Sequence, residues 1–214
     1  MADPERDLPI MKASEIRDKF GGDYVADDRT FTMGIDHRFA AHFAGRFQGL
    51  DVLETCTGAG FTTIFLAWAA RRVITVEVDP DIQQQAVANL ETAGLSSQVT
   101  FLQGDILDPD LLNRLPPVNA AFLDPDWAVT GPAHVFRFRN SNTRPPADRL
   151  LRRIFTLTEN VALVLPPRID VGELDDLPAH ERESLFLGDS HALFCLYFGR
   201  LLRAPGPTEF RIPV

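Results

Sequence analysis

The sequence predicts one α/β domain with a seven-stranded, mostly parallel sheet, helices on both faces and a terminal antiparallel hairpin. Three observations support this prediction. An apolar strand runs through two glycines into an apolar helix over residues 51–70, strand-like and helical patterns then alternate as far as residue 165, and two strand-like runs flank Gly188-Asp189-Ser190. Alternating strands and helices are typical of parallel sheets, because helices make the crossover connections.

The composition is that of a globular protein. The chain has 214 residues, of which 45% are hydrophobic, enough for a full core. The two cysteines, Cys56 and Cys195, cannot form a disulfide framework and suit a reducing compartment. The first residues contain no apolar block typical of a signal peptide, and no apolar run is long enough to span a bilayer. We therefore expect a cytoplasmic protein without membrane contact.

The main domain is expected over residues 30–203, between an N-terminal arm (1–29) and a C-terminal tail (204–214). The arm is polar and of mixed charge, which indicates a mobile segment with a short helix. Residues 30–33 indicate a short extended piece, and apolar residues at helical spacing predict a helix over 37–47. His37 and His42 flank that apolar face and are interpreted as helix surface. No cluster of Cys, His and acidic residues has metal-ligand spacing, so no metal site is predicted.

The glycine turn is the first feature that indicates a ligand. Gly58 and Gly60 lack a Cβ, so the backbone can turn tightly and approach a bound molecule. The amides that open the following helix are donors suited to a polar ligand. A dinucleotide fingerprint would have a third small residue shortly after Gly60, and it is missing here. Glu54, four residues before Gly58, is suited to accept a hydrogen bond from an ammonium group.

The second strand ends in acidic residues. An apolar run over 73–78 contains Glu77 and leads to Asp79-Pro80, where the next helix is expected to begin. An acid about 20 residues after the glycines, at a strand end, is placed to accept from ribose hydroxyls. Asp before Pro is a good helix start, so we assign the ribose role to Glu77 and the cap to Asp79. The alternative is that both acids serve only the helix, which is expected over 81–93 and ends at Gly94.

Two further strands each deliver polar residues. The third, over 99–102, leads to Gly104-Asp105-Ile106, where the acid can accept from an adenine amine while Ile106 packs on the ring. A short helix over 109–115 follows. The fourth strand, over 118–123, delivers Asp124-Pro125-Asp126-Trp127. A helix over 147–158, a fifth strand over 161–165 and a hairpin of 183–187 with 191–198 complete the predicted elements.

Taken in order, the Glu54 to Gly60 turn, Glu77, Gly104-Asp105 and the Asp124 to Trp127 motif resemble the class I S-adenosylmethionine (SAM)-dependent methyltransferases. Within that class the chain resembles the trimethylguanosine synthase family of RNA cap guanine-N2 methyltransferases. The resemblance spans residues 30–203 and is most specific at 31–32, 73–80, 160–166 and 192–203. It implies a Rossmann-like class I fold, SAM as methyl donor, S-adenosylhomocysteine as product, and methylation of an exocyclic guanine amine.

The resemblance also implies residue roles. The methionine end of SAM would contact Glu54 and the glycines, the ribose Glu77 and the adenine Asp105, while Trp127 would stack on the guanine base. The implied cofactor-binding positions are Thr32, Glu54, Thr55, Thr57, Gly58, Gly60, Phe61, Glu77, Val78, Asp105, Ile106 and Asp124. The implied catalytic positions are Asp124, Asp126 and Trp127.

One position departs from the family pattern. Amine methyltransferases of this kind carry Asn, Asp or Ser, then two prolines and an aromatic residue, whereas the second proline is Asp126 here. Asp124 can still accept a hydrogen bond from the target amine and orient it. Asp126 could add an acceptor or take the released proton. Equally, it could repel an anionic substrate or mark a changed activity.

The partner of this site is predicted to be RNA or a guanine nucleotide. The formal charge of −9 argues against broad nucleic-acid binding. An arginine-rich stretch follows the motif, with Arg137, Arg139, Arg144, Arg149, Arg152 and Arg153 opposed only by Asp148. This stretch is either a solvated surface or a set of phosphate contacts, with Arg137 and Arg139 as candidate substrate-binding residues.

Two other functions would account for parts of the pattern. A SAM-binding sensor or partner subunit without methyl transfer would explain the altered motif at Asp126. An NAD-dependent oxidoreductase would share the glycine turn and Glu77, but it leaves Glu54 and the Asp124 to Trp127 motif unexplained. The sequence makes no prediction of the oligomeric state.

Overall fold

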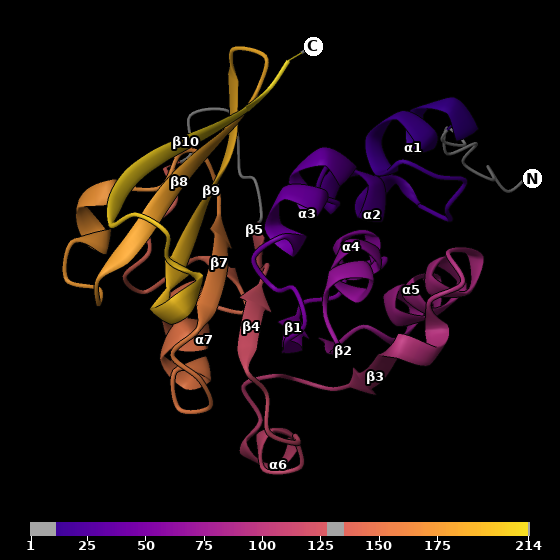
Figure 1. The fold of residues 1–214 in the computed structure, drawn as a ribbon, viewed down its shortest axis with the longest axis horizontal. Coiled ribbons are helices and arrows are strands. Elements are labelled where there is room, and N and C mark those ends of the chain that lie inside the picture. The colour runs from indigo at the N-terminus through magenta and orange to yellow at the C-terminus, as the bar shows by residue number, and fades with distance from the viewer. Residues whose placement is uncertain (1–11, 128–134, 214) are drawn as a thin grey trace, which may run out of the picture.

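The computed structural model describes residues 12–127 and 135–213 and is organised around one large sheet (Figure 1). Its strands are β1 (Asp51–Thr55), β2 (Arg72–Glu77), β3 (Val99–Gln103), β4 (Ala120–Leu123), β7 (Val161–Leu165), β8 (His180–Leu187), β9 (Ser190–Phe198) and β10 (Gly206–Ile212). Their order is β10-β8-β9-β7-β4-β1-β2-β3. The strands from β3 to β7 run parallel, and β9 is antiparallel to both β7 and β8. The predicted α/β class and terminal hairpin are confirmed.

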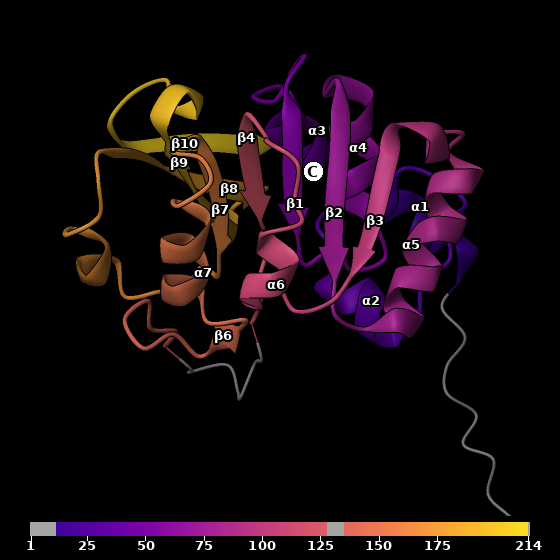
Figure 2. The ribbon, with the colours of Figure 1, turned by 90° about the horizontal axis from the view of Figure 1, so that it is seen from below.

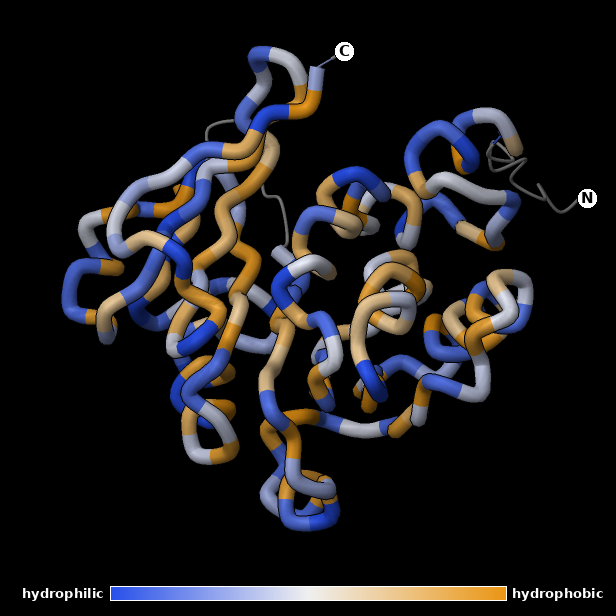
Figure 3. Tube along the Cα trace, viewed as in Figure 1, coloured by the Kyte–Doolittle hydropathy of each residue, from blue (hydrophilic) through white to orange (hydrophobic). Residues whose placement is uncertain are grey.

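Helices cover both faces of this sheet (Figure 2). They are α1 (Ala13–Phe20), α2 (Asp28–Met33), α3 (His37–Ala44), α4 (Phe61–Ala69), α5 (Pro80–Thr92), α6 (Pro109–Leu112) and α7 (Ala147–Ile154), with short 3-10 turns η1 (Ser96–Gln98), η2 (Val171–Leu174) and η3 (Gly199–Leu201). Side chains of α3 and α4 share one core with Val52, and those of α6 and α7 share the other with Leu53. The side chains of these two neighbouring strand residues therefore lie on opposite faces of the sheet, as expected for a pleated strand. The apolar character of α4 is visible in Figure 3.

The N-terminal region differs from the expected mobile arm. Residues 1–11 of that arm lie outside the described residues, but α1 is anchored to the domain. The Phe20 ring is 1% exposed and stacks on Phe61 with 3.5 Å between ring centroids. Val25 exchanges two backbone hydrogen bonds with the Asn89 side chain of α5, at 2.7 and 2.9 Å. Residues 13–29 thus pack against the domain and form part of it.

The extended piece expected at residues 30–33 is the end of helix α2. Asp27 caps this helix, because its carboxylate accepts from the Thr30 amide at 2.8 Å. An Asp at the N-cap satisfies a free helix amide, which here outweighs the β-branched threonines that suggested an extended segment. The consequence matters for function, since α2 reaches over the carboxyl ends of the strands.

The expected C-terminal tail is also wrong. Residues 206–212 form β10, which pairs parallel to β8 and makes eight strands where seven were predicted. Pro207 is compatible with this strand because β10 lies at the sheet edge, where one side needs no ladder bond. Val214 lies outside the described residues.

A buried ionic network joins the segment after α3 to the hairpin. Arg46 forms two hydrogen bonds with the Glu181 carboxylate, at 2.8 and 2.9 Å, and both side chains are 3% exposed. Desolvation works to raise the pKa of Glu181, but the bonds from Arg46 and other donors lower it to about 2. His42 does not lie free on the surface: its Nε2 is 2.9 Å from Glu183, and its ring stacks on Phe210.

Candidate active site

A cavity of about 390 Å3 opens at the carboxyl ends of β1, β2, β3 and β4, beneath α2. Open α/β sheets bind ligands in this place, and the volume is that of a small-molecule site. Most of the predicted site residues line it: Thr32, Thr57, Gly58, Phe61, Glu77, Val78, Asp105, Ile106, Asp124, Asp126 and Trp127. The structure therefore brings residues from four strand ends together around one cavity.

The glycine turn shapes the floor of this cavity. Gly58 has φ +55°, and its amide donates to Glu77 Oε2 at 2.9 Å. Gly60 has φ +81°, and a Cβ there would lie 2.9 Å from Leu90 and 3.1 Å from Ala86. Gly60 therefore allows α5 to pack closely rather than lining the cavity. Helix α4 begins at this turn without a side-chain cap, which leaves its first amides for another partner.

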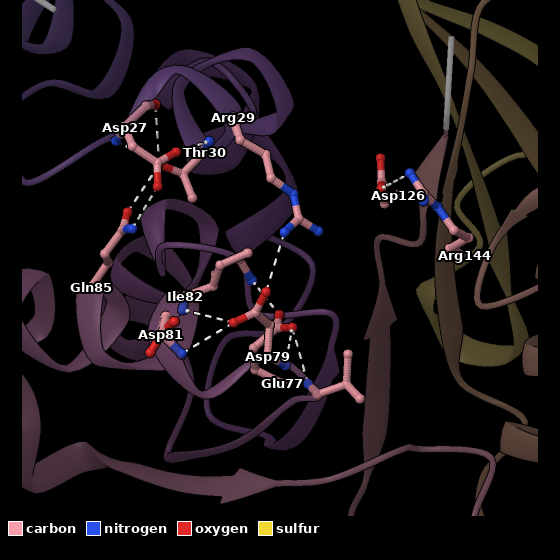
Figure 4. Close-up of polar contacts among 12 residues, drawn as sticks. Asp27, Arg29, Thr30, Glu77, Asp79, Asp81, Ile82, Gln85, Asp126 and Arg144 are labelled. Atoms are coloured by element: carbon pink, nitrogen blue, oxygen red, sulfur yellow. Dashed lines mark hydrogen bonds and ion pairs between the residues drawn. The ribbon is translucent and has the colours of Figure 1, made fainter. Parts of the chain in front are cut away.

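Glu77 joins three loop amides on the cavity wall. Its Oε2 accepts from Gly58, and its Oε1 accepts from the amides of Val78 and Asp79, each at 3.0 Å (Figure 4). A carboxylate has about four lone-pair positions, so one remains for a ligand hydroxyl. Asp79 caps α5 as predicted and is paired with Arg29 of α2 at 3.2 Å.

Glu54 and Thr55 do not line the cavity. The Glu54 side chain lies behind the glycine turn, 2% exposed, and accepts from the hydroxyls of Thr63 and Thr75, both at 2.6 Å. Thr55 is fully buried in β1. The predicted direct contact of Glu54 with an ammonium group is therefore wrong in geometry. Its influence on the cavity is electrostatic.

Carboxyl groups lie on the cavity floor, at Asp124, and behind it, at Glu54. Desolvation, then the charges of Glu54 and Asp126, raises the pKa of Asp124 to about 8. Burial raises the pKa of Glu54 to about 7 against two hydroxyl bonds that lower it, and the charge of Glu77 adds to the rise. The pKa of the neighbouring Cys56 thiol is raised by burial and by Glu77 and Asp124. Among the described residues, none donates a hydrogen bond to the Asp124 carboxyl group.

The motif after β4 forms a small sheet of its own. Strand β5 (Asp126–Trp127) pairs antiparallel with β6 (Thr143–Arg144), so that Asp126 faces Arg144. The Arg144 guanidinium donates to Asp126 Oδ2 at 2.9 Å (Figure 4). Trp127 is half-buried and packs against both cores while one part of it lines the cavity.

Arg137 and Arg139 do not reach the cavity. Arg137 donates twice to Glu173, and Arg139 pairs with Asp176. Two of the six arginines in that stretch are therefore paired with acids that lie more than 30 residues further along the chain. The assignment of these two arginines to the substrate is corrected: Arg144 is the arginine of that stretch which lines the cavity.

Sequence reasoning missed part of the wall. Arg29, Thr30, Met33, Gly34 and Ile35 line the cavity from the N-terminal side, and Arg144 and Pro145 line it from the opposite side. A Cβ at Gly34 would lie 2.7 Å from the rings of both Phe20 and Phe61, so glycine lets this segment close over the turn. Of these features, only helix α2 could have been predicted from the sequence, from Asp27 as its N-cap, and that residue does not predict that α2 lies over the cavity.

Within 12–127 and 135–213, no group of three His, Cys, Asp or Glu side chains is arranged to hold a metal ion. Over the same residues, every helix is too short or too polar to cross a lipid bilayer.

The family model of the RNA cap guanine-N2 methyltransferases matches residues 50–184. Trimethylguanosine synthase of Schizosaccharomyces pombe is 32% identical over 69% of this chain and 64% of its own length. A catechol O-methyltransferase of Niastella koreensis is also 32% identical, over 58% of this chain and 59% of its own length. The chain thus spans less than two thirds of the length of these relatives. The crystal structure of a proposed methyltransferase from Porphyromonas gingivalis W83 has the same fold, with a TM-score of 0.69 and 16% identity over 90% of this chain and 48% of that one.

Proposed function

Because the chain belongs to the RNA cap guanine-N2 methyltransferase family, we propose that it transfers a methyl group from SAM to an exocyclic amine. The acceptor we propose is guanine N2, in an RNA or a guanine nucleotide. The observation that supports this most is the cavity at the ends of β1 to β4, where an acidic floor meets a half-buried tryptophan.

The acidic floor favours a cationic ligand. The pKa values of Asp124 and Glu54 are raised chiefly because burial desolvates their carboxyl groups, and further because other carboxylates lie nearby. SAM carries both a sulfonium and an ammonium group, and either would relieve this repulsion. NAD carries its positive charge on the nicotinamide ring and two negative phosphates, which an acidic floor disfavours.

The remaining walls suit a nucleoside. Glu77 has one lone-pair position left after binding three amides, which is suited to a ribose hydroxyl. Ile106 is buried and lines the cavity beside Asp105, giving an apolar surface and an acceptor for an adenine ring. The exposed Val78 lies on the same wall. These roles are the ones that motif matching assigns to the same positions.

The acceptor side is formed by Asp124 and Trp127. SAM, when bound, supplies an electrophilic methyl group on its sulfonium. Asp124, ionised once a cation lies nearby, accepts a hydrogen bond from the amine and orients its lone pair, and it is placed to take the proton that the amine loses. The indole of Trp127 offers a face on which a base can stack, worth about 1–3 kcal/mol.

A matched pair of acceptors tests the proposal. The protein is incubated with radiolabelled SAM and either GTP or ITP, which differs from GTP only in lacking the exocyclic amine, and with RNAs containing guanosine or inosine at the same positions. We expect label in the guanine compounds alone. Label in ITP, or in a catechol but not in guanine, would refute guanine N2 as the acceptor.

The non-catalytic alternative predicts a different result. A SAM-binding protein without transfer would bind S-adenosylhomocysteine and label no acceptor. Asp124→Asn provides the control for a true reaction, because it keeps the shape of the side chain but cannot take a proton. We expect its kcat, measured at saturating SAM, to fall at least about 100-fold. Equal kcat values for wild type and Asp124→Asn would exclude the proposed role of Asp124.

A further inference from the structure

Asp126, the residue that departs from the family motif, has a partner in the structure. Strands β5 and β6 place it directly opposite Arg144, and the two side chains form an ion pair at 2.9 Å. Cross-strand neighbours of opposite charge stabilise each other. The carboxylate is 17% exposed, whereas the guanidinium is 68% exposed and lines the cavity. The guanidinium is therefore the more accessible group of the ion pair.

The donors of Arg144 are largely unused by the described residues. Among the described residues its side chain forms one hydrogen bond, from Nη2 to Asp126, whereas a guanidinium has five N–H donors. Its planar fork matches the oxygens of a phosphate, which is why arginine is common in phosphate sites. Arg137 differs, since its Nε and Nη2 both bind Glu173.

The other arginine on the cavity wall lies on the cofactor side. Arg29 comes from α2 and pairs with Asp79, next to the proposed ribose position at Glu77. Figure 4 shows the two pairs separated across the site. Arg144 is thus the cationic group that lies beside Asp126 and Trp127, where the acceptor is expected.

We propose that Asp126 positions Arg144 to bind a phosphate of the acceptor, so that the cavity selects a phosphorylated base over the free base. This inference rests on the proposed function for the base itself, but the phosphate contact can be measured separately. Towards an anionic acceptor, the ion pair with Arg144 offsets the negative charge of Asp126. In a protein with a formal charge of −9, such a local cation is what an anionic acceptor requires.

Calorimetric titration with pyrophosphate tests the contact without a base or a methyl transfer. We expect wild type to bind pyrophosphate, and Arg144→Gln to bind it about tenfold or more weakly. Arg152→Gln is the matched control, since Arg152 is 76% exposed on α7, outside the cavity, and only 4.0 Å from Asp148. It should bind pyrophosphate like wild type. No binding by wild type, or equal losses in both variants, would overturn the proposal.

Asp126→Ala separates positioning from simple charge. Removing a negative charge beside an anion site would tighten pyrophosphate binding if Asp126 only repelled anions. Positioning predicts the reverse, a loss of at least about threefold, with Asp126→Asn retaining more affinity because it keeps an acceptor oxygen for Arg144. Tighter binding by Asp126→Ala would contradict the positioning role.

Guanosine and GMP then connect the contact to the acceptor. We expect wild type to have a lower KM for GMP than for guanosine, and the ratio of these two KM values to approach one in Arg144→Gln. If pyrophosphate binds through Arg144 but guanine is not methylated, the proposed acceptor fails and the phosphate contact stands. If guanine is methylated with equal KM for both compounds, the phosphate contact fails and the proposed function stands.

Discussion

Glu77→Gln removes the charge from the carboxylate that joins the glycine turn to the end of β2. The wild-type side chain accepts from three amides, those of Gly58, Val78 and Asp79, at 2.9 to 3.0 Å. A glutamine has one acceptor oxygen, so it can accept either from the Gly58 amide or from the amides of Val78 and Asp79. The second arrangement keeps two of the three hydrogen bonds and leaves the Gly58 amide over. The remaining amide then faces an NH2 group and loses its acceptor.

The magnitude follows from these bonds. A hydrogen bond to a charged group contributes about 1.5–3 kcal/mol, a neutral one about 0.5–1.5 kcal/mol, and an unsatisfied buried donor costs about 1–3 kcal/mol. Two bonds become neutral and one donor is left without a partner, although water in the cavity can replace part of that bond. We therefore expect the free energy of unfolding to fall by about 2–4 kcal/mol.

Urea unfolding, followed by circular dichroism, measures this change. With a slope of about 2 kcal/mol per molar urea, the midpoint should shift by about 1–2 M. Glu91→Gln is the matched control, since Glu91 is exposed on α5, and it should stay within about 0.5 kcal/mol of wild type. An equally small change for Glu77→Gln would refute the assigned role of its carboxylate.

Three further outcomes are expected. At pH 7, binding of SAM should release more protons than binding of S-adenosylhomocysteine, because only SAM carries a sulfonium cation that lowers the pKa of Asp124 from about 8. Calorimetry in buffers of different ionisation heat measures the number of protons released. Equal release by the two compounds would contradict the proposed effect of the sulfonium on Asp124. Gly60→Ala should lose about 2–4 kcal/mol in urea through strain and contact with Leu90, whereas Gly49→Ala, with φ +73° and open space, should lose only the strain of about 1–2 kcal/mol. Glu181 has a depressed pKa in the folded protein, so its stabilisation is present above pH 4.5 and is lost as the pH falls towards 2; the slope of unfolding free energy over that range should flatten in Glu181→Gln.

Local chemistry allowed much of the fold to be predicted. Asp79-Pro80 and Gly94 mark the start and end of α5, because an acidic cap and a left-handed glycine act within a few residues. The strand ends at Glu77 and Asp124 follow from apolar runs that stop at an acid. Such signals need no knowledge of tertiary contacts, and the structure confirms the elements that they predict.

The corrected features depend on contacts between distant residues. Glu54 lies in a strand buried on both faces, so sequence could not tell whether it faces the cavity or Thr63 and Thr75. The partner of Arg137 is Glu173, which a local count of charge omits. Residues 206–212 form a strand because they pair with the edge strand β8, a contact between distant parts of the chain. Pro207 argued against a strand in the sequence.

The most direct test of the account is calorimetric titration of S-adenosylhomocysteine into wild type and two arginine variants. Val78 is 64% exposed and lines the cavity, so Val78→Arg should obstruct it without unfolding the protein. Val171→Arg, at a position 37% exposed and away from the cavity, is the control. We expect micromolar-range binding to wild type and Val171→Arg, and binding at least about tenfold weaker to Val78→Arg. No binding to wild type, or equal binding to all three, would contradict a cofactor site at the ends of β1 to β4.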